Sequence, residues 1–446
     1  MSTVEPKLVI RLGSHAEKDY VIKMSKFLDG FMVAGNLIEA TPGATGSLLI
    51  KFGGNIQKLP FYIDPMTYGF AEDLRLLKSD QKRKKKVVFD FKRSYKRLAS
   101  QFGGVFQDVI DDDTPLQLSD LQQQDVIDKV VESVADYQLN RIRDEFRLDA
   151  ELANFEESVP SPAAILTPYF YCKGKRISDW ADLIPRIAKA TVALKKGIPV
   201  HAVVCATQDL LLDVTARKKL IEGLNESGCE GVWLWFTALN EYLVDTVTLA
   251  ALRTLTEELS ENMEVHNMHG GFFSLALSKY GMASTAHGVG YGEQKDIAPI
   301  QGQAMPTVRY YLPPVARRLG VPDIERTFNS LGITSVAEFH EQICDCVICK
   351  GVVKNNLSEF SSFGDKHLAS PASKRKSQTP AAAKRCRFHF MLNRIREVKE
   401  VSGSTLDQVI TNLTDSKSAW ESEPSVSSDI RFLSRWISAL SPEEIA

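Results

Sequence analysis

Short apolar runs rich in β-branched and aromatic residues alternate with longer segments of helical period through most of the first 340 residues. This alternation is typical of repeated β-α units, in which helices cover a parallel sheet. Eight such runs favour a (β/α)8 barrel over an open doubly wound sheet, so the predicted fold class is α/β. The expected strands are 46–52, 59–64, 163–171, 200–207, 231–238, 263–271, 282–292 and 307–313.

Helical segments separate several of these strands and dominate the end of the chain. Residues 216–228 carry an apolar stripe that stops at glycine, and residues 246–262 repeat apolar positions at three and four. Residues 386–401 are also helical in pattern, and the stretches 405–413 and 428–440 are amphipathic. We expect these last helices to cap the barrel or to contact another chain.

Composition restricts the class of protein without naming a partner. With 446 residues, of which 44% are hydrophobic and 25% charged, the chain can bury one large core with appendages. The net charge of −2 means that only local clusters can indicate a partner. Seven cysteines and no apolar secretory segment argue against a disulfide framework, and no run approaches the roughly 18 apolar residues of a membrane helix. We expect a soluble, cytoplasmic protein that does not enter membranes.

Three cysteines fall within six positions of one segment: Cys344, Cys346 and Cys349. Thiolates at this C-x-C-x-x-C spacing can surround one soft cation, and zinc then needs a fourth ligand. We prefer His389 for it, with Cys386 one turn earlier as the alternative and His367 also nearby in sequence. A closed Cys3His site has no room for water or substrate, so zinc would be structural. Three ordinary reduced thiols are the competing interpretation.

These patterns divide the chain into three parts. We expect a barrel domain over 1–340, a zinc-binding subdomain over 341–400 and a C-terminal helical extension over 401–446. Within the second part, residues 367–386 are rich in Ser, Ala, Pro, Lys and Arg, which predicts a flexible basic loop.

A barrel followed by C-x-C-x-x-C and a later histidine in "HFMLNRIREV" resembles the tRNA-guanine transglycosylase superfamily, over about residues 55–400. The segment "FYIDPMTYGF" and the order of strands and helices from 200 to 282 carry the resemblance further. It implies a TIM-type barrel with a structural zinc ion and base exchange in DNA or tRNA. In that reaction a carboxylate attacks C1′ of a guanosine, guanine leaves, and a 7-deazaguanine takes its place. Members of the family commonly pair, which implies a homodimer or a partner protein.

The chain departs from the family pattern where the nucleophile is expected. Ala286 or His287 stands in place of the aspartate, and the nearest carboxylates are Glu293 and Asp296. Likewise, no aspartate stands in "TPYFYC", and Cys205 replaces an expected amide. Fold and zinc therefore carry over from the resemblance better than the reaction does.

Candidate catalytic and binding residues remain at the expected strand ends. Asp64 ends a predicted strand, where barrel enzymes place working groups, although Asp before a helix also serves as a turn or cap. His287 and Glu293 are candidate replacements for the missing carboxylate. Tyr291 and His269 are candidate substrate-binding residues, with a bulged strand or a structural histidine as the competing interpretations.

Two basic clusters indicate nucleic acid as a partner. Residues 78–97 contain ten Lys or Arg against two Asp, including Lys84, Lys85 and Arg93, with three aromatic residues between them. A second cluster lies at 374–387. Such clusters bind phosphates without regard to sequence, although many charge runs are only solvated surface.

The sequence therefore favours a guanine transglycosylase-like enzyme, a pentosyltransferase that inserts a 7-deazaguanine into DNA or tRNA. The alternative is a non-catalytic relative that binds nucleic acid or a partner subunit and has lost the nucleophilic aspartate. A metal-stabilised barrel that acts on an unrelated small molecule is a third hypothesis, and it predicts no binding of nucleic acid at low salt.

Overall fold

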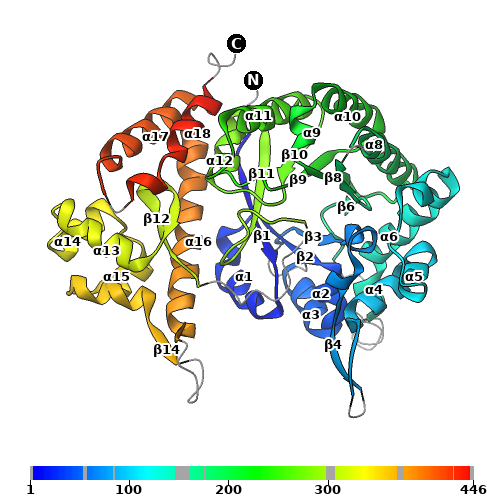
Figure 1. Cartoon of the computed structure of the whole chain (residues 1–446), viewed down its shortest axis with the longest axis horizontal. Helices are drawn as coiled ribbons and strands as arrows, with labels where there is room; N and C mark the ends of the chain where they lie inside the picture. The colour runs from blue at the N-terminus through cyan, green and yellow to red at the C-terminus, as the bar shows by residue number, and fades with distance from the viewer. Residues whose placement is uncertain are drawn as a thin grey trace.

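A nearly closed barrel of parallel strands forms the centre of the molecule (Figure 1). The computed structural model describes residues 4–53, 58–83, 86–145, 160–174, 177–297, 307–368, 376–424 and 426–441. The barrel strands are β1 (Lys7–Leu12), β2 (Gly30–Ala34), β3 (Phe61–Asp64), β6 (Ile165–Leu166), β7 (Tyr171–Cys172), β8 (Val200–Thr207), β9 (Gly231–Thr237), β10 (Glu264–Asn267) and β11 (Met282–Gly288).

Strand order follows the chain around the ring. The hydrogen-bonded order is β3-β2-β1-β11-β10-β9-β8-β6, with β7 also on β8, and every pairing is parallel. The remaining gap lies between β3 and β6, where the N–H of Ala163 donates to the carbonyl oxygen of Phe61 at 2.8 Å. All strands run the same way, so their carboxyl ends meet at one mouth.

Both faces of the barrel strands are buried, which explains their composition. Seven of the eight residues of β8 are buried, as are six of the seven of β9, including Trp233 and Trp235. Strands covered on both faces read as continuous apolar runs, because the barrel interior and the outer helices each need apolar partners.

Helices follow most barrel strands and form the outer layer. On the amino-terminal half these are α1 (Lys18–Met24), α2 (Gly35–Ala40), α3 (Pro42–Gly53), α4 (Arg93–Phe102), α5 (Gly104–Asp111) and α6 (Gln124–Glu145). The others are α8 (Ile177–Ala193), α9 (Asp209–Leu212), α10 (Val214–Ser227), α11 (Thr246–Ser260) and α12 (Phe272–Ala276). A two-stranded hairpin, β4 (Lys78–Arg83) and β5 (Lys86–Phe91), interrupts the outer layer after β3.

A second layer follows β11 and flanks the barrel on the left of Figure 1. It contains two antiparallel hairpins, β12 (Tyr310–Leu312) with β13 (Arg317–Leu319) and β14 (Lys366–Leu368) with β15 (Lys376–Gln378). Its helices are α13 (Val321–Ser330), α14 (Val336–Gln342), α15 (Val347–Val353), α16 (Pro380–Gly403), α17 (Leu406–Trp420) and α18 (Phe432–Leu440). The long α16 contacts both β12 and the barrel strand β1, and α18 packs on α11. None of the helices in the described part of the chain is long and apolar enough to cross a membrane.

Two of the eight expected strands are wrong as barrel strands. Residues 46–52 lie in α3, because Leu48, Leu49 and Phe52 bury one helical face. The strand expected at 307–313 exists only as β12, which pairs with β13 outside the barrel. The barrel instead uses β1 and β2, which the sequence did not indicate.

The basic loop expected at 367–386 is partly structured. It begins within β14, includes β15 and ends within α16, whose first turn starts at Pro380 after the N-cap Thr379. Residues 369–375 lie outside the described residues.

Candidate functional site

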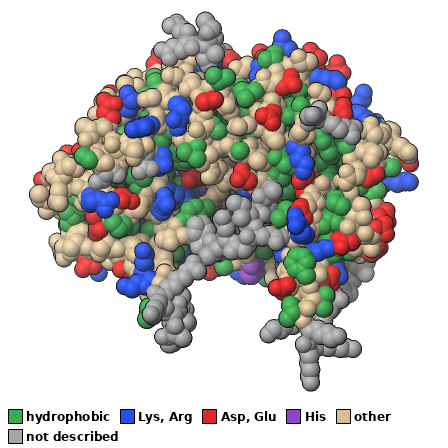
Figure 2. Space-filling model, viewed as in Figure 1, with side chains coloured by type: hydrophobic (Ala, Val, Ile, Leu, Met, Phe, Trp, Pro, Cys, Tyr) green, Lys and Arg blue, Asp and Glu red, His purple; other side chains and the backbone are tan. Residues whose placement is uncertain are grey.

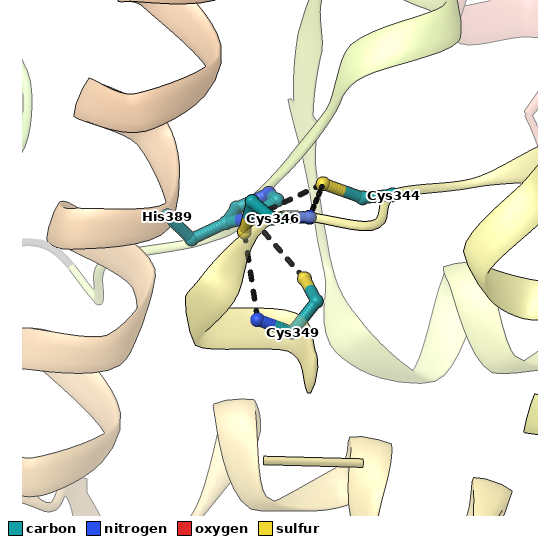
Figure 3. A group of neighbouring side chains, drawn as sticks. All are labelled: Cys344, Cys346, Cys349 and His389. Carbon is teal, nitrogen blue, oxygen red and sulfur yellow. Dashed lines mark hydrogen bonds between the residues drawn. The ribbon is translucent and has the colours of Figure 1, made fainter. Parts of the chain in front are cut away.

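Four side chains that can hold a metal ion meet beside the barrel: Cys344, Cys346, Cys349 and His389. Figure 3 shows the three cysteines at the turn into α15, facing the histidine on α16. All four are buried, with exposed fractions of 6% or less. Cys346 is the N-cap of α15, and its sulfur accepts the backbone N–H of Cys349 at 3.5 Å.

The ligand atoms have the spacing of a tetrahedral site. His389 Nδ1 lies 3.9, 3.4 and 3.3 Å from the sulfurs of Cys344, Cys346 and Cys349. Zinc bonds of about 2.3 Å to sulfur and about 2.0 Å to nitrogen separate tetrahedral ligands by roughly 3.5–3.8 Å. The donor set and its geometry are therefore compatible with zinc.

Surrounding groups fix the histidine in the form that a cation needs. His389 Nε2 lies 2.6 Å from the carbonyl oxygen of Tyr311, so this nitrogen carries the proton and Nδ1 presents its lone pair to the sulfurs. Tyr310 stacks on the imidazole with ring centres 4.1 Å apart. Its hydroxyl lies 3.2 Å from the sulfur of Cys349 and can donate to a thiolate.

Cysteine ionisation couples the cluster to cation binding. Hydrogen bonds with Cys346 and Cys349 hold the pKa of Cys344 far below its ordinary value, whereas burial holds the pKa of Cys349 well above it. A cation would displace the remaining thiol proton, so affinity should fall as pH falls.

The alternative fourth ligands lie elsewhere. Cys386 is buried, its thiol donates to the carbonyl oxygen of Phe363 at 3.4 Å, and burial raises its pKa to about 12. His367 is exposed on β14. Of the three candidates, His389 is the one whose ring lies close to the three sulfurs, so these four side chains could hold a metal ion together.

At the barrel mouth, Asp64 ends β3 and is fully buried and hydrogen-bonded. Its Oδ2 accepts from Arg11 Nη2 at 2.7 Å, and its Oδ1 accepts from the hydroxyl of Tyr169 at 2.7 Å and the N–H of Met66 at 3.0 Å. Burial and the charge of Asp64 raise the pKa of Tyr169 well above its ordinary value, so that phenol remains a donor. This arrangement holds a carboxylate in place without exposing it to solvent.

His287 and Glu293 share a second buried cluster. Burial, and then the charge of Arg394, lowers the pKa of His287 to about 3, and its Nδ1 lies 2.9 Å from the carbonyl oxygen of Gly288. Glu293 contacts Arg394 Nη2 at 2.5 Å and Arg318 Nε at 3.2 Å. Burial alone would raise the pKa of Glu293, but the two guanidiniums hold it below its ordinary value. Glu293 is therefore a paired anion and His287 a neutral ring.

The candidate substrate-binding residues lie in different places. His269 is buried near the mouth, where its Nδ1 contacts the carbonyl oxygen of Gly292 at 3.1 Å. Tyr291 is partly buried beside the second cluster, whereas Arg93 is exposed at the start of α4. Lys84 and Lys85 lie outside the described residues.

Several residues of the mouth carried no local sequence signal. Arg11 on β1 and Trp235 on β9 stand at strand ends, and Lys295 follows β11. The indole ring brings them together, because Arg11 Cζ and Lys295 Nζ lie 5.9 and 5.6 Å from its centre. The ring of His269 lies 4.8 Å from the same indole. Only the position of Arg11 and Trp235 at the ends of parallel strands could have indicated them.

The chain matches no family model, and no curated protein matches its sequence. The resemblance to tRNA-guanine transglycosylases therefore rests on the residues themselves. Those residues are the Cys3His cluster, whose cysteines follow the last barrel strand and whose histidine lies on α16, and Asp64 at the end of β3.

A further group of possible metal ligands lies at the amino end of the barrel, where His201, Glu264 and His266 approach within 4.8 Å. Trp233 Nε1 donates to His201 Nδ1 at 3.2 Å, so neutral His201 carries its proton on Nε2. Neither ring nitrogen of His201 then offers a free lone pair, because Nδ1 accepts from the indole and Nε2 carries the proton. His201 and His266 stack with ring centres 5.0 Å apart, which we interpret as a buried neutral pair.

Buried neutral histidines predict a stability that falls in acid. Burial is the largest cause that lowers the pKa of both His201 and His287 to about 3, against an ordinary 6.5. Because these folded-state pKa values are depressed, their contribution is complete above pH 6.5 and is lost as pH falls toward 3. Within that window, each of the two histidines should lower the free energy of unfolding by about 1.4 kcal/mol for every pH unit of acidification. Denaturant unfolding between pH 7 and pH 5 measures this slope.

The His201→Gln variant keeps an acceptor for Trp233 and removes the titration. We expect its stability to fall less steeply with acid than that of the parent chain. His367→Gln, which alters an exposed side chain, should leave the slope unchanged. Equal slopes for the parent chain and His201→Gln would contradict the assignment of a neutral buried histidine.

Proposed function

We propose that the chain is a TIM-type barrel of the tRNA-guanine transglycosylase superfamily, stapled by structural zinc, that exchanges or cleaves a purine base in DNA or tRNA. The observation that carries this proposal is the Cys3His cluster, whose cysteines follow β11 and whose histidine lies on α16. Four protein ligands leave no position for water or substrate, so the zinc would join α15 to α16 rather than take part in the reaction.

Asp64 is the carboxylate best placed to serve the reaction. It lies at the carboxyl end of β3, where barrel enzymes place catalytic groups, and it is paired with Arg11. The role that we assign to it is proton transfer or attack on C1′, with a 7-deazaguanine as the incoming base. The buried Tyr169 would keep the carboxylate oriented through its hydroxyl.

Nucleic acid is the proposed partner because of the basic hairpin after β3. Figure 1 shows β4 and β5 extending away from the barrel, and the sequence between Lys82 and Lys86 is entirely Lys and Arg. On this hairpin the side chain of Val87 is 64% exposed and that of Phe89 is 51% exposed. Cations beside an exposed aromatic ring fit a phosphate backbone with unstacked bases. Elsewhere on the face in Figure 2, cationic and anionic side chains are interspersed.

A second candidate function is a non-catalytic reader or partner subunit. Ala286 and His287 occupy the strand end where the resemblance requires an aspartate, and Glu293 is held between two guanidiniums. A chain that kept its metal and its basic surface after losing the nucleophile would still bind nucleic acid.

Nucleoside mass spectrometry separates these two candidates. DNA and tRNA would be digested from native cells that carry either the parent chain or Asp64→Asn at matched expression. We expect a 7-deazaguanine nucleoside in either the DNA or the tRNA of cells with the parent chain, and we expect it to be absent from cells with Asp64→Asn. The pool that loses the nucleoside identifies the substrate. Because Asp64 is buried, soluble yield and metal content must match between the two chains. Unchanged pools without any such nucleoside would favour the non-catalytic candidate.

A further inference from the structure

Lys295 is held at the carboxyl end of β9 by hydrogen bonds on its own and the next residue. Trp235 Nε1 donates to the carbonyl oxygen of Lys295 at 2.7 Å, and the N–H of Ala238 donates to Asp296 Oδ1 at 2.9 Å. Trp235 of β9 and Ala238, which follows that strand, thus fix this backbone at the mouth. A lysine fixed in this way projects from a rigid support.

The amine of Lys295 has no ion-pair partner among the residues that the structure describes. Its Nζ lies 5.6 Å from the centre of the Trp235 ring, and the neighbouring cation, Arg11, is already paired with Asp64. Burial, and then the charge of Arg11, lowers the pKa of Lys295 to about 8. A substantial fraction of the amine is therefore neutral near physiological pH, which is the nucleophilic form.

A proton acceptor, His269, packs against the same indole ring of Trp235. His269 is buried, and burial together with the charges of Arg11 and Lys295 keeps its pKa well below the ordinary value. Its Nδ1 donates to the carbonyl oxygen of Gly292, so Nε2 presents a lone pair that has no hydrogen-bond partner in the described part of the chain. A nucleophile and a neutral base beside one aromatic ring are the parts of a condensation site.

We propose that Lys295 is a catalytic nucleophile that condenses with an aldehyde, and that its target is C1′ of a deoxyribose that has lost its base. This inference rests on the proposed function, because base removal generates that aldehyde. The amine nitrogen forms a bond to C1′ as the π bond of the carbonyl breaks, and the oxygen takes up the first of the two amine protons. His269 accepts the proton from nitrogen and returns it to the departing hydroxyl. One water leaves and an imine remains, with no change in oxidation state.

Reductive trapping tests the inference on the whole 446-residue chain, purified in the presence of zinc. The chain is incubated with a single-stranded oligonucleotide that contains one abasic deoxyribose, in the presence of cyanoborohydride, and the adduct is located by peptide mass spectrometry. We expect an adduct on Lys295 whose formation rises with pH through about 8. Lys295→Met and Lys295→Arg should abolish it, and His269→Gln should slow it about 100-fold. Lys279→Met, at a buried lysine outside the mouth, is the control and should keep the adduct.

Two further arms separate failure of this inference from failure of the proposed function. A mobility shift of the same oligonucleotide without reductant measures binding alone, and ribose 5-phosphate replaces the oligonucleotide as a free aldehyde. An adduct on Lys295 with the sugar phosphate but no binding of DNA would support the nucleophile and overturn its nucleic-acid target. Binding of DNA without an adduct on Lys295 from either aldehyde would overturn the inference and leave the proposed function standing.

Discussion

Replacing Cys349 with alanine is expected to remove the metal ion and to unfold the layer that α15 and α16 form. The thiol lies 3.3 Å from His389 Nδ1 inside a cluster that is buried on all sides. Structural zinc contributes on the order of 10 kcal/mol of apparent binding free energy, comparable with the whole net stability of a domain. We expect about one zinc per parent chain by elemental analysis, almost none in Cys349→Ala, and a melting temperature lower by roughly 10 °C or more.

The matched control is Cys386→Ala, which also deletes a buried thiol near His389. Cys386 donates to the carbonyl oxygen of Phe363 and does not belong to the metal cluster. This variant should keep its zinc and lose only about 1–2 kcal/mol for the small cavity. A strong chelator should lower the melting temperature of the parent chain and of Cys386→Ala, but not that of Cys349→Ala. Absence of zinc from the parent chain would leave three ordinary reduced thiols as the correct interpretation, and one zinc retained by Cys349→Ala would exclude Cys349 as a ligand.

The metal cluster could be predicted because its information is local. The spacing of Cys344, Cys346 and Cys349 brings three sulfurs together within one turn, whatever the rest of the chain does. The fourth ligand needed a longer inference, and helical period was sufficient to place His389 on α16. The residues that orient the histidine, Tyr310 and Tyr311, come from β12 and could not be read from the spacing.

The barrel could be predicted as a pattern but not strand by strand. Residues 200–207 and 231–237 are buried on both faces and are continuous apolar runs, so their assignment was straightforward. Residues 46–52 misled because Leu48, Leu49 and Phe52 fit a short strand as well as one face of a helix. Strands of five or six residues such as β1 and β2 give weak signals, because their burial depends on neighbours far along the chain.

The barrel mouth could not be predicted because its contacts are distant in sequence. Arg11 and Asp64 are 53 residues apart, and Tyr169 reaches Asp64 from the connection between β6 and β7. Strand-end position suggested Asp64, but its pairing with Arg11 depends on β1 lying two strands away in the ring. A single sequence can therefore indicate candidate residues for such a site, but only the three-dimensional structure shows which residues they contact.

Replacing Arg394 with methionine is expected to be strongly destabilising. Its side chain is fully buried and lies 2.5 Å from Glu293 Oε1 and 2.9 Å from Glu397 Oε2. Removing one partner of a buried pair leaves uncompensated charge, which costs about 3–5 kcal/mol. Arg396→Met is the control on the same helix, because Arg396 is 44% exposed and pairs with the exposed Asp345, so its loss should cost about 1 kcal/mol or less. Denaturant unfolding of both variants at pH 7 gives the comparison.

The difference in the free energy of unfolding between the parent chain and Arg394→Met should become smaller as pH falls. In the parent chain the pKa of Glu293 is depressed by Arg318 and Arg394, so its contribution exists above the ordinary 4.5 and is lost as pH falls. Without Arg394, burial should raise the pKa of this carboxyl, and the variant then loses stability as pH rises. The two free-energy curves should therefore converge toward low pH.

The comparison also decides what Glu293 can do. If Arg394→Met lowers the free energy of unfolding no more than Arg396→Met does, Glu293 does not depend on Arg394. Glu293 would then remain a candidate carboxylate for proton transfer. The other outcome is that Arg394→Met lowers the free energy of unfolding strongly and that adding Glu293→Gln in the double variant recovers part of that loss. This result would mean that the Glu293 anion serves to balance the charge of Arg394 inside the protein. Glu293 would then be an unsuitable replacement for the missing aspartate, and the reacting groups would have to come from the mouth, where Asp64, His269 and Lys295 lie.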